Sequence, residues 1–257
     1  MASEISPRAE VSPKAKIGDN CKIYPFVYIE DDVVIGDNCI IHPFVSILNG
    51  ARIGKGNHIH QGSVISALPQ DFEFQGDKTE VVIGKNNIIR ENVVINRGTH
   101  AGGQTVIGNK NYLMEGVHIL HDTKIGNQCA FGFGTKIAGD CEIGNGVVFT
   151  AAVLQLPNTR VGDCALVTSG SIFNKDIPPY VIVGNNPVSF NGVNAPMCKA
   201  IGIEEKVVKH IANAYRLVFR GKVSLFDATL QIKEQVPDGP EIQKIIDFLS
   251  TSKKGVI

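Results

Sequence analysis

An aliphatic or aromatic residue recurs at every sixth position over most of this chain. The series runs without a gap from the amino end and resumes in the same phase after each interruption. Its members are Ile5, Val11, Ile17, Ile23, Ile29, Ile35, Ile41, Ile47, Ile53, Ile59 and Ile65, then Ile83, Ile89 and Ile95, then Ile107, Leu113, Ile119, Ile125, Phe131, Ile137, Ile143 and Phe149, then Val161 and Val167. Six residues turn an α-helix by about 600°, which is 240° out of register, so the pattern excludes a helix. It predicts short strands separated by corners, with one apolar side chain per unit in a shared core.

Glycine and small residues occupy fixed places in the same unit. Glycine often follows the aliphatic residue, as a backbone corner requires. Four of the six cysteines stand four residues after an aliphatic position, at Cys21, Cys39, Cys129 and Cys141. We interpret them as buried fillers in preference to redox or nucleophilic groups. The cysteine spacing predicts neither a disulfide framework nor a structural metal site.

The six-residue phase is interrupted by two segments and by the single polar residue Gln155, which occupies an inward position. Residues 66–82 and 97–105 are rich in glycine and polar residues, so we expect both to be loops that leave the strand wall. Binding groups concentrate on loops carried by a rigid scaffold. These two loops are therefore candidate parts of a functional site.

The carboxy-terminal segment has a different periodicity. Val207, Ile211, Tyr215 and Val218 follow one another at helical spacing, and the stretches SLFDATLQIKEQV and GPEIQKIIDFLS predict two further helices. We expect a β-structured domain over residues 1–186 and a helical domain over residues 187–257.

Composition removes several function classes. The 257 residues are 43% apolar and 19% charged, and the 25 basic residues equal the 25 acidic ones, so nothing favours nucleic acid or an anionic membrane as partner. The amino end lacks a signal peptide, and no window approaches the roughly 18 apolar residues of a membrane span. These features predict a cytoplasmic protein without an integral membrane segment.

The stretch GVHILHD is the strongest candidate for chemistry. His121 and Asp122 lie between the core positions Ile119 and Ile125, and His118 directly precedes Ile119. Their spacing alone also fits exposed wall residues. By contrast, His42 and His60 share one slot with Tyr24 on successive coils, which predicts a stacked outer ladder.

The repeat, aliphatic-Gly-x-x-small-x, resembles that of the hexapeptide-repeat acyltransferases. This resemblance implies a mainly β fold, a left-handed parallel β-helix with three strands per coil, ending in a helical cap. The stretches ALPQDFEFQGDKTEVVIG, IIRENVVINRGT, HILHD, DIPPYVIVGNNP, GVN and IANAYRLVFR occur in the order found in the UDP-N-acetylglucosamine 3-O-acyltransferase family, and the resemblance spans nearly the whole chain.

Members of that family move a 3-hydroxyacyl chain from acyl carrier protein to the 3-hydroxyl of UDP-N-acetylglucosamine, the first step of lipid A synthesis. The resemblance implies an O-acyltransferase without a cofactor, since the acyl group arrives on the phosphopantetheine of the carrier. It also implies a homotrimer with the site between neighbouring prisms. The expected partners are therefore acyl carrier protein, a UDP-sugar and further copies of the chain.

The family's motifs assign roles to individual residues. His121 matches the general base, Asp122 matches the carboxylate that orients it, and the backbone N–H of Gly139 matches the donor to the developing oxyanion. His118 matches a substrate contact. The weaker assignments are substrate contacts at Gln70, Asp71, Asn194, Asp140, Gln155 and Ser169, where Ser169 would limit the acyl groove, and carrier-protein contacts at Arg216, Arg220 and Lys222.

Several family positions are changed in this chain. Histidines of the family are replaced by Asn96 and Asp140, and a His-Gln pair by Leu156-Pro157. An acidic residue and an arginine pair after GVN are replaced by Pro196 and Ala200-Ile201. Loss of arginines that pair with phosphate is not a neutral change. These changes keep open a paralogous acyltransferase that acts on a different, amino-bearing nucleotide sugar.

Two other kinds of protein share the repeat. Zinc carbonic anhydrases on the same β-helix need three converging histidines, whereas the pair here is three residues apart and the next coil offers Gly139 and Asp140. A catalytically degenerate β-helix that only binds acyl carrier protein is the non-enzymatic alternative. It predicts carrier binding without acyl transfer.

Overall fold

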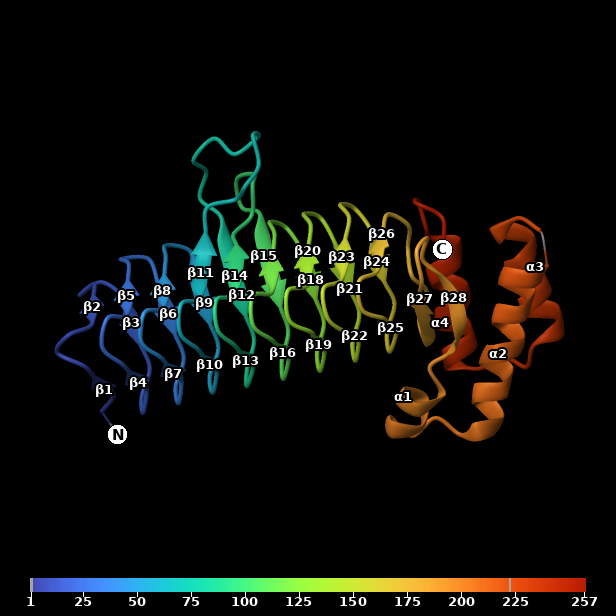
Figure 1. Cartoon of the computed structure of the whole chain (residues 1–257), viewed down its shortest axis with the longest axis horizontal. Helices are drawn as coiled ribbons and strands as arrows, with labels where there is room; N and C mark the ends of the chain where they lie inside the picture. The colour runs from blue at the N-terminus through green and yellow to red at the C-terminus, as the bar shows by residue number, and fades with distance from the viewer. Residues whose placement is uncertain (1, 222) are drawn as a thin grey trace.

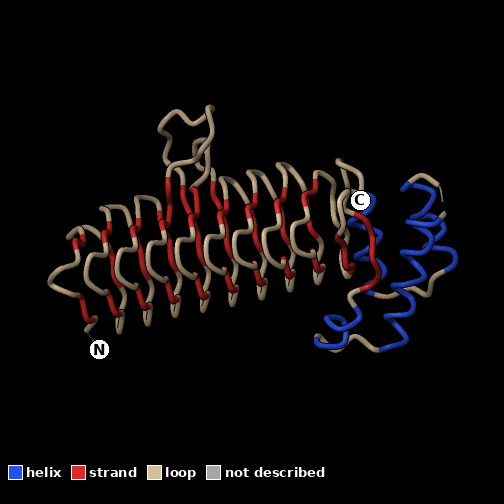
Figure 2. The backbone as a smooth tube through the Cα atoms, viewed as in Figure 1, coloured by secondary structure: helices blue, strands red, loops and turns tan. Residues whose placement is uncertain are grey.

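The chain forms a long prism of stacked coils followed by a helical bundle (Figure 1). The computed structural model describes residues 2–221 and 223–257. Most strands have only two residues, and each coil contributes one strand to each of three parallel sheets. Corners occupy the rest of each coil (Figure 2). The strand-and-corner architecture predicted from the six-residue period is therefore confirmed.

The three sheets form the walls of the prism. Sheet A contains β1 (Glu4–Ile5), β4 (Lys22–Ile23), β7 (Ile40–Ile41), β10 (His58–Ile59), β13 (Ile88–Ile89), β16 (Tyr112–Leu113), β19 (Ala130–Phe131), β22 (Val148–Phe149), β25 (Leu166–Val167), β27 (Val181–Gly184) and β28 (Ser189–Val193). Sheet B contains β2 (Glu10–Val11), β5 (Tyr28–Ile29), β8 (Ser46–Ile47), β11 (Val64–Ala67), β14 (Val94–Asn96), β17 (His118–Ile119), β20 (Lys136–Ile137), β23 (Leu154–Gln155) and β26 (Ile172–Phe173). Sheet C contains β3 (Lys16–Ile17), β6 (Val34–Ile35), β9 (Ala51–Ile53), β12 (Glu80–Ile83), β15 (Gln104–Ile107), β18 (Lys124–Ile125), β21 (Glu142–Ile143) and β24 (Arg160–Val161).

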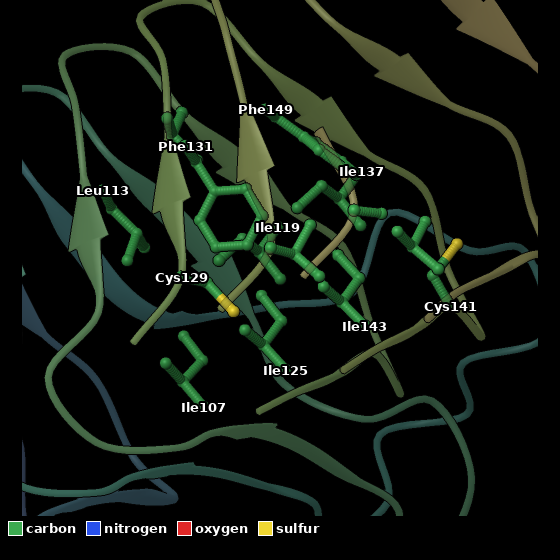
Figure 3. Packing of buried hydrophobic residues seen from close by; sticks show 14 of the residues in the cluster. Ile107, Leu113, Ile119, Ile125, Cys129, Phe131, Ile137, Cys141, Ile143 and Phe149 are labelled. Carbon is green, nitrogen blue, oxygen red and sulfur yellow. The ribbon is translucent and has the colours of Figure 1, made fainter. Parts of the chain in front are cut away.

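The pairing register stacks equivalent residues of successive coils. Ile119 pairs with Ile137, 18 residues later, and both side chains are fully buried. Figure 3 shows these side chains interdigitating inside the prism. Burial of each such side chain contributes roughly 1.5–3 kcal/mol before conformational entropy is charged. Ile5 is 46% exposed because it lies in the first coil, which has no coil before it.

The cysteines are core residues, as predicted. All six are buried and reduced. Burial raises the pKa of Cys39 to about 11 and that of Cys129 to about 12. Because the thiolate is the reactive form, these thiols are unreactive at neutral pH.

Both predicted excursion loops leave the corner between sheets B and C. The first connects β11 to β12 and the second connects β14 to β15, and they stand above the prism in Figure 1. The Gly102 N–H donates to the Lys78 carbonyl at 3.0 Å, and the Arg97 guanidinium lies 5.6 Å from the Phe74 ring centroid. The two loops therefore support each other.

The described residues after the prism form four helices: α1 (Ala195–Ala200), α2 (Glu205–Arg220), α3 (Leu225–Gln235) and α4 (Pro240–Ser250). The last three were expected from their periodicity, whereas α1 is too short to show one. The predicted division at residues 186 and 187 falls in the turn between β27 and β28. The Tyr215 hydroxyl donates to the Pro179 carbonyl, so the bundle is fastened to the last coil.

The ladder of Tyr24, His42 and His60 is confirmed. The rings of Tyr24 and His42 stack at 5.3 Å, and those of His42 and His60 at 4.5 Å. Burial is the main cause that lowers the pKa of both histidines below 6.5. Below pH 6.5 the unfolded chain therefore binds more protons than the folded one, and stability is lost as the pH falls.

We expect His42→Tyr to reduce this acid sensitivity, because it keeps a stacked ring and removes one titrating group. The measurement is the midpoint of thermal unfolding at about pH 7.5 and about pH 5. Between these two pH values, the unfolding midpoint of the native protein should fall further than that of the variant. His210→Tyr, outside the ladder, is the control and should behave as the native protein does. Equal losses in all three proteins would contradict the prediction.

Candidate active site

One edge of the prism gathers most of the predicted site. The chain passes from sheet B to sheet C at this corner, and successive coils place there the loop with Asp71, the loop with Thr99, then His121, then Gly139. The 18-residue register lays the His121 corner over the Gly139 corner, and the Asp140 N–H donates to the His121 carbonyl at 3.1 Å. Site residues that are far apart in the sequence thus lie in a row along the edge of the prism between sheets B and C.

His121 lies between two carboxylates. Its Nδ1 is 3.1 Å from Asp122 Oδ2, and its Nε2 is 3.4 Å from Asp71 Oδ2. The His121 side chain is 12% exposed. Asp122 can therefore orient the ring through Nδ1, which is the pairing of a base with an orienting carboxylate that general-base catalysis uses.

The second loop holds Asp122 in place. The Thr99 N–H donates to Asp122 Oδ2 at 2.8 Å, so the same oxygen faces both Thr99 and the imidazole. Asp122 has a left-handed backbone with φ of 54°, a conformation that aspartate tolerates better than most residues. The contribution of Thr99 has no signal in the sequence beyond its position in a glycine-rich excursion.

Gly139 packs directly against the imidazole ring of His121. A Cβ at this position would clash with Cε1 and Nε2 of His121, so no other residue leaves the ring where it is. From the coil below, the Asn158 N–H donates to the Gly139 carbonyl at 3.2 Å. The structure therefore supplies a steric reason for glycine, in addition to the predicted role of its N–H.

Asp140 adds a third carboxylate to this corner. Burial raises its pKa, with Asp122 and Asp71 acting in the same direction and His121 opposing them. Asp140, at a position where the resemblance implies a histidine, thus adds an acidic group to the site.

His118 lies on the outer face of sheet B and contacts Asn96 on the preceding coil. Its Nε2 is 2.7 Å from Asn96 Oδ1, while Asn96 Nδ2 donates to the Leu68 carbonyl. Because Oδ1 can only accept, His118 carries its proton on Nε2 and leaves Nδ1 as an acceptor. Burial, followed by the charge of Lys136, lowers the pKa of His118. A neutral His118 is thus a polar contact with a defined tautomer.

Two predicted substrate contacts, Gln155 and Asn194, have buried side chains with hydrogen-bond partners inside this chain, so their substrate roles stay predictions. Gln155 has no exposed surface, and its Nε2 donates to the carbonyl and hydroxyl of Thr159 inside the prism. Residue 155 is an inward position of the six-residue repeat, so its side chain points into the prism. Asn194 is 2% exposed and acts as the cap of α1, since its Oδ1 accepts from Met197 N–H and its Nδ2 donates to the Cys164 carbonyl.

Other predicted residues lie elsewhere. Gln70 is exposed beside Asp71 in the first loop. Ser169 stands at the corner between sheets A and B, where its hydroxyl is 3.0 Å from that of Thr150, so a single chain does not bring it to His121. Arg216 and Arg220 are exposed on α2, and Lys222 lies outside the described residues. The roles of these residues stay predictions.

Residues 2–221 and 223–257 contain no group of three histidine, cysteine or acidic side chains placed to hold a metal ion. Within the same ranges, no helix has the length and apolar character needed to cross a membrane.

Comparison with known families defines the class of protein. The six-repeat description of the bacterial hexapeptide transferases matches residues 14–49, 32–67 and 104–139. The description "UDP N-acetylglucosamine O-acyltransferase, domain 2" matches residues 176–257. The coiled domain is a left-handed parallel β-helix, as predicted, and the protein is a hexapeptide-repeat acyltransferase.

Full-length relatives narrow the class further. Two curated proteins named acyl-(acyl-carrier-protein)–UDP-N-acetylglucosamine O-acyltransferase are similar to nearly the whole chain. The one from Sulfurihydrogenibium sp. is 43% identical over 98% of this chain and 94% of that protein. The one from Halorhodospira halophila is 34% identical over 99% of both chains. The crystal structure of the UDP-N-acetylglucosamine acyltransferase from Bacteroides fragilis 9343 has a TM-score of 0.96 and 46% identity over 98% of this chain and 99% of that one. The chain belongs to the UDP-N-acetylglucosamine O-acyltransferase family.

Proposed function

We propose that this enzyme transfers a 3-hydroxyacyl group from acyl carrier protein to the 3-hydroxyl of UDP-N-acetylglucosamine, the first step of lipid A synthesis. The observation that carries the proposal is the imidazole of His121, held between Asp122 and Asp71 directly above Gly139. The names and full-length similarity of the relatives support the choice of substrates. We also propose that the enzyme acts in the cytoplasm, as expected from the sequence.

The reaction proceeds by general-base catalysis. His121 Nε2 takes the proton of the sugar hydroxyl as that oxygen attacks the thioester carbon, and Asp122 orients the ring through Nδ1. Asp71, which faces Nε2, is placed to contact the same hydroxyl. The Gly139 N–H stabilises the oxyanion that forms on the thioester carbonyl. Collapse of this intermediate breaks the carbon–sulfur bond, and the leaving phosphopantetheine thiolate takes the proton back from His121, so the transfer needs no cofactor.

The partner surfaces follow from the exposed groups. Arg216 and Arg220 give α2 a basic face that suits an acidic carrier protein. A homotrimer brings the corner between sheets A and B, with Ser169, toward a neighbouring catalytic corner. Ser169 then limits the length of the acyl chain.

The test is an assay of the purified protein with hydroxyacyl carrier proteins of several chain lengths and a panel of UDP-sugars that includes an amino-bearing acceptor. Mass spectrometry of the products should show ester formation on UDP-N-acetylglucosamine. Preferential acylation of the amino-bearing sugar would replace the proposed acceptor. Carrier binding without a product from any sugar would favour the degenerate scaffold.

A further inference from the structure

A cleft opens beside the catalytic corner. It has a volume of about 690 Å³ and extends from Asp140 and Glu142 past Asn158 and Arg160 to Lys253 and Lys254. Asp140 directly follows Gly139, so one end of the cleft meets the corner that carries His121. The other end meets the carboxy-terminal tail, which runs beside the last coils in Figure 1.

The tail is fastened on both sides of the two lysines. Before them, the Thr251 hydroxyl accepts from Arg160 Nη1 at 3.2 Å, and the Ser252 hydroxyl donates to Asp176 Oδ2 at 2.8 Å. After them, the Asp176 N–H donates to the Gly255 carbonyl at 2.9 Å. Lys253 and Lys254 therefore project from a short loop with two anchors, which limits the conformational freedom that a bound ligand must remove.

The charges in the cleft are separated along its length. Asp176 is 1% exposed and accepts from both the backbone and the Nε of Arg160, so these two charges offset each other. Asp140 and Glu142 remain at the catalytic end. The ammonium groups of Lys253 and Lys254 stand at the tail end, and among the described residues neither forms an ion pair. The tail end is thus suited to an anion whose uncharged portion extends toward His121.

We propose that this cleft binds the phosphate-bearing arm of a substrate, with Lys253 and Lys254 paired to the phosphate. The inference rests on the proposed function, in which both substrates carry phosphate esters: the diphosphate of the UDP-sugar and the phosphodiester of phosphopantetheine.

The test variant is Lys253→Ala/Lys254→Ala. Its matched control is Lys55→Ala/Lys85→Ala, two exposed lysines on neighbouring coils nearer the amino end. KM for UDP-N-acetylglucosamine, KM for the hydroxyacyl carrier protein and kcat are measured separately. Binding of UDP and of free 4′-phosphopantetheine is measured by titration calorimetry. We expect about a tenfold or larger rise in one of the two KM values with little change in kcat, and recovery in Lys253→Arg/Lys254→Arg.

The pattern of losses identifies the source of the phosphate. Weaker UDP binding with a higher KM for the sugar assigns the cleft to the acceptor, and weaker phosphopantetheine binding with a higher KM for the carrier assigns it to the donor. Unchanged KM values and unchanged binding of both probes would overturn the proposal, as would a loss confined to kcat. If the native protein transfers no acyl group, the proposed function fails, yet lysine-dependent binding of either probe still supports the cleft.

Discussion

Replacing His121 with alanine should lower kcat for acyl transfer by about 10²- to 10⁴-fold, the usual contribution of a general base. The reason is geometric, since no other imidazole among the described residues is within hydrogen-bonding distance of Asp122. The measurement is the rate of acyl-sugar formation under saturating donor and acceptor. Substrate affinity should change much less than kcat, because proton transfer occurs only on the way to the transition state.

His58→Ala is the control for this experiment. His58 lies on β10 in the wall formed by sheet A, away from the corner between sheets B and C, so its removal should leave transfer intact. Circular dichroism and thermal unfolding should show that both variants keep the fold, since neither side chain belongs to the buried core. Transfer at the native rate by His121→Ala would show that another group is the base.

Gly139→Ala should lower kcat/KM by about 10²-fold or more, because misplacing a reacting group by about 1 Å costs this much. The added Cβ would clash with the ring of His121, which must rotate or shift away from Asp122 and Asp71. The variant keeps its backbone N–H, so the expected loss arises from displacement of the base and not from deletion of the oxyanion donor. The measurement is steady-state kinetics with both substrates varied.

Gly239→Ala is the matched control for the added methyl group. A Cβ at Gly239 would have its nearest neighbour, Glu241 Oε2, at 3.8 Å, an ordinary contact, and the position precedes α4 far from His121 along the chain. This variant should retain native kinetics. A crystal structure of Gly139→Ala with His121 unmoved, or full activity of that variant, would refute the steric role of the glycine.

The periodic part of the fold follows from local sequence. The aliphatic and aromatic positions found by counting in sixes are all buried from Ile23 to Val167, because a coil of three short strands repeats the same packing requirement in each unit. Gln155 occupies an inward position of the same series, and it is fully buried there. Its burial follows from the six-residue repeat, whereas a role as a substrate contact would need an exposed side chain. The six-residue repeat is a stronger constraint on side-chain direction than a possible ligand contact, because backbone packing fixes that direction whether or not a ligand is bound.

The candidate site was predictable as a set of residues but not as an arrangement. The sequence by itself determined that His121 and Asp122 lie between core anchors and that two loops interrupt the wall. Only the tertiary structure brought Asp71 to Nε2, placed the Thr99 N–H on Asp122, and turned Asn194 into a helix cap. The physical reason is that repeat spacing specifies which residues share a corner, whereas contacts between loops and the packing of the helical cap depend on segments that have no period.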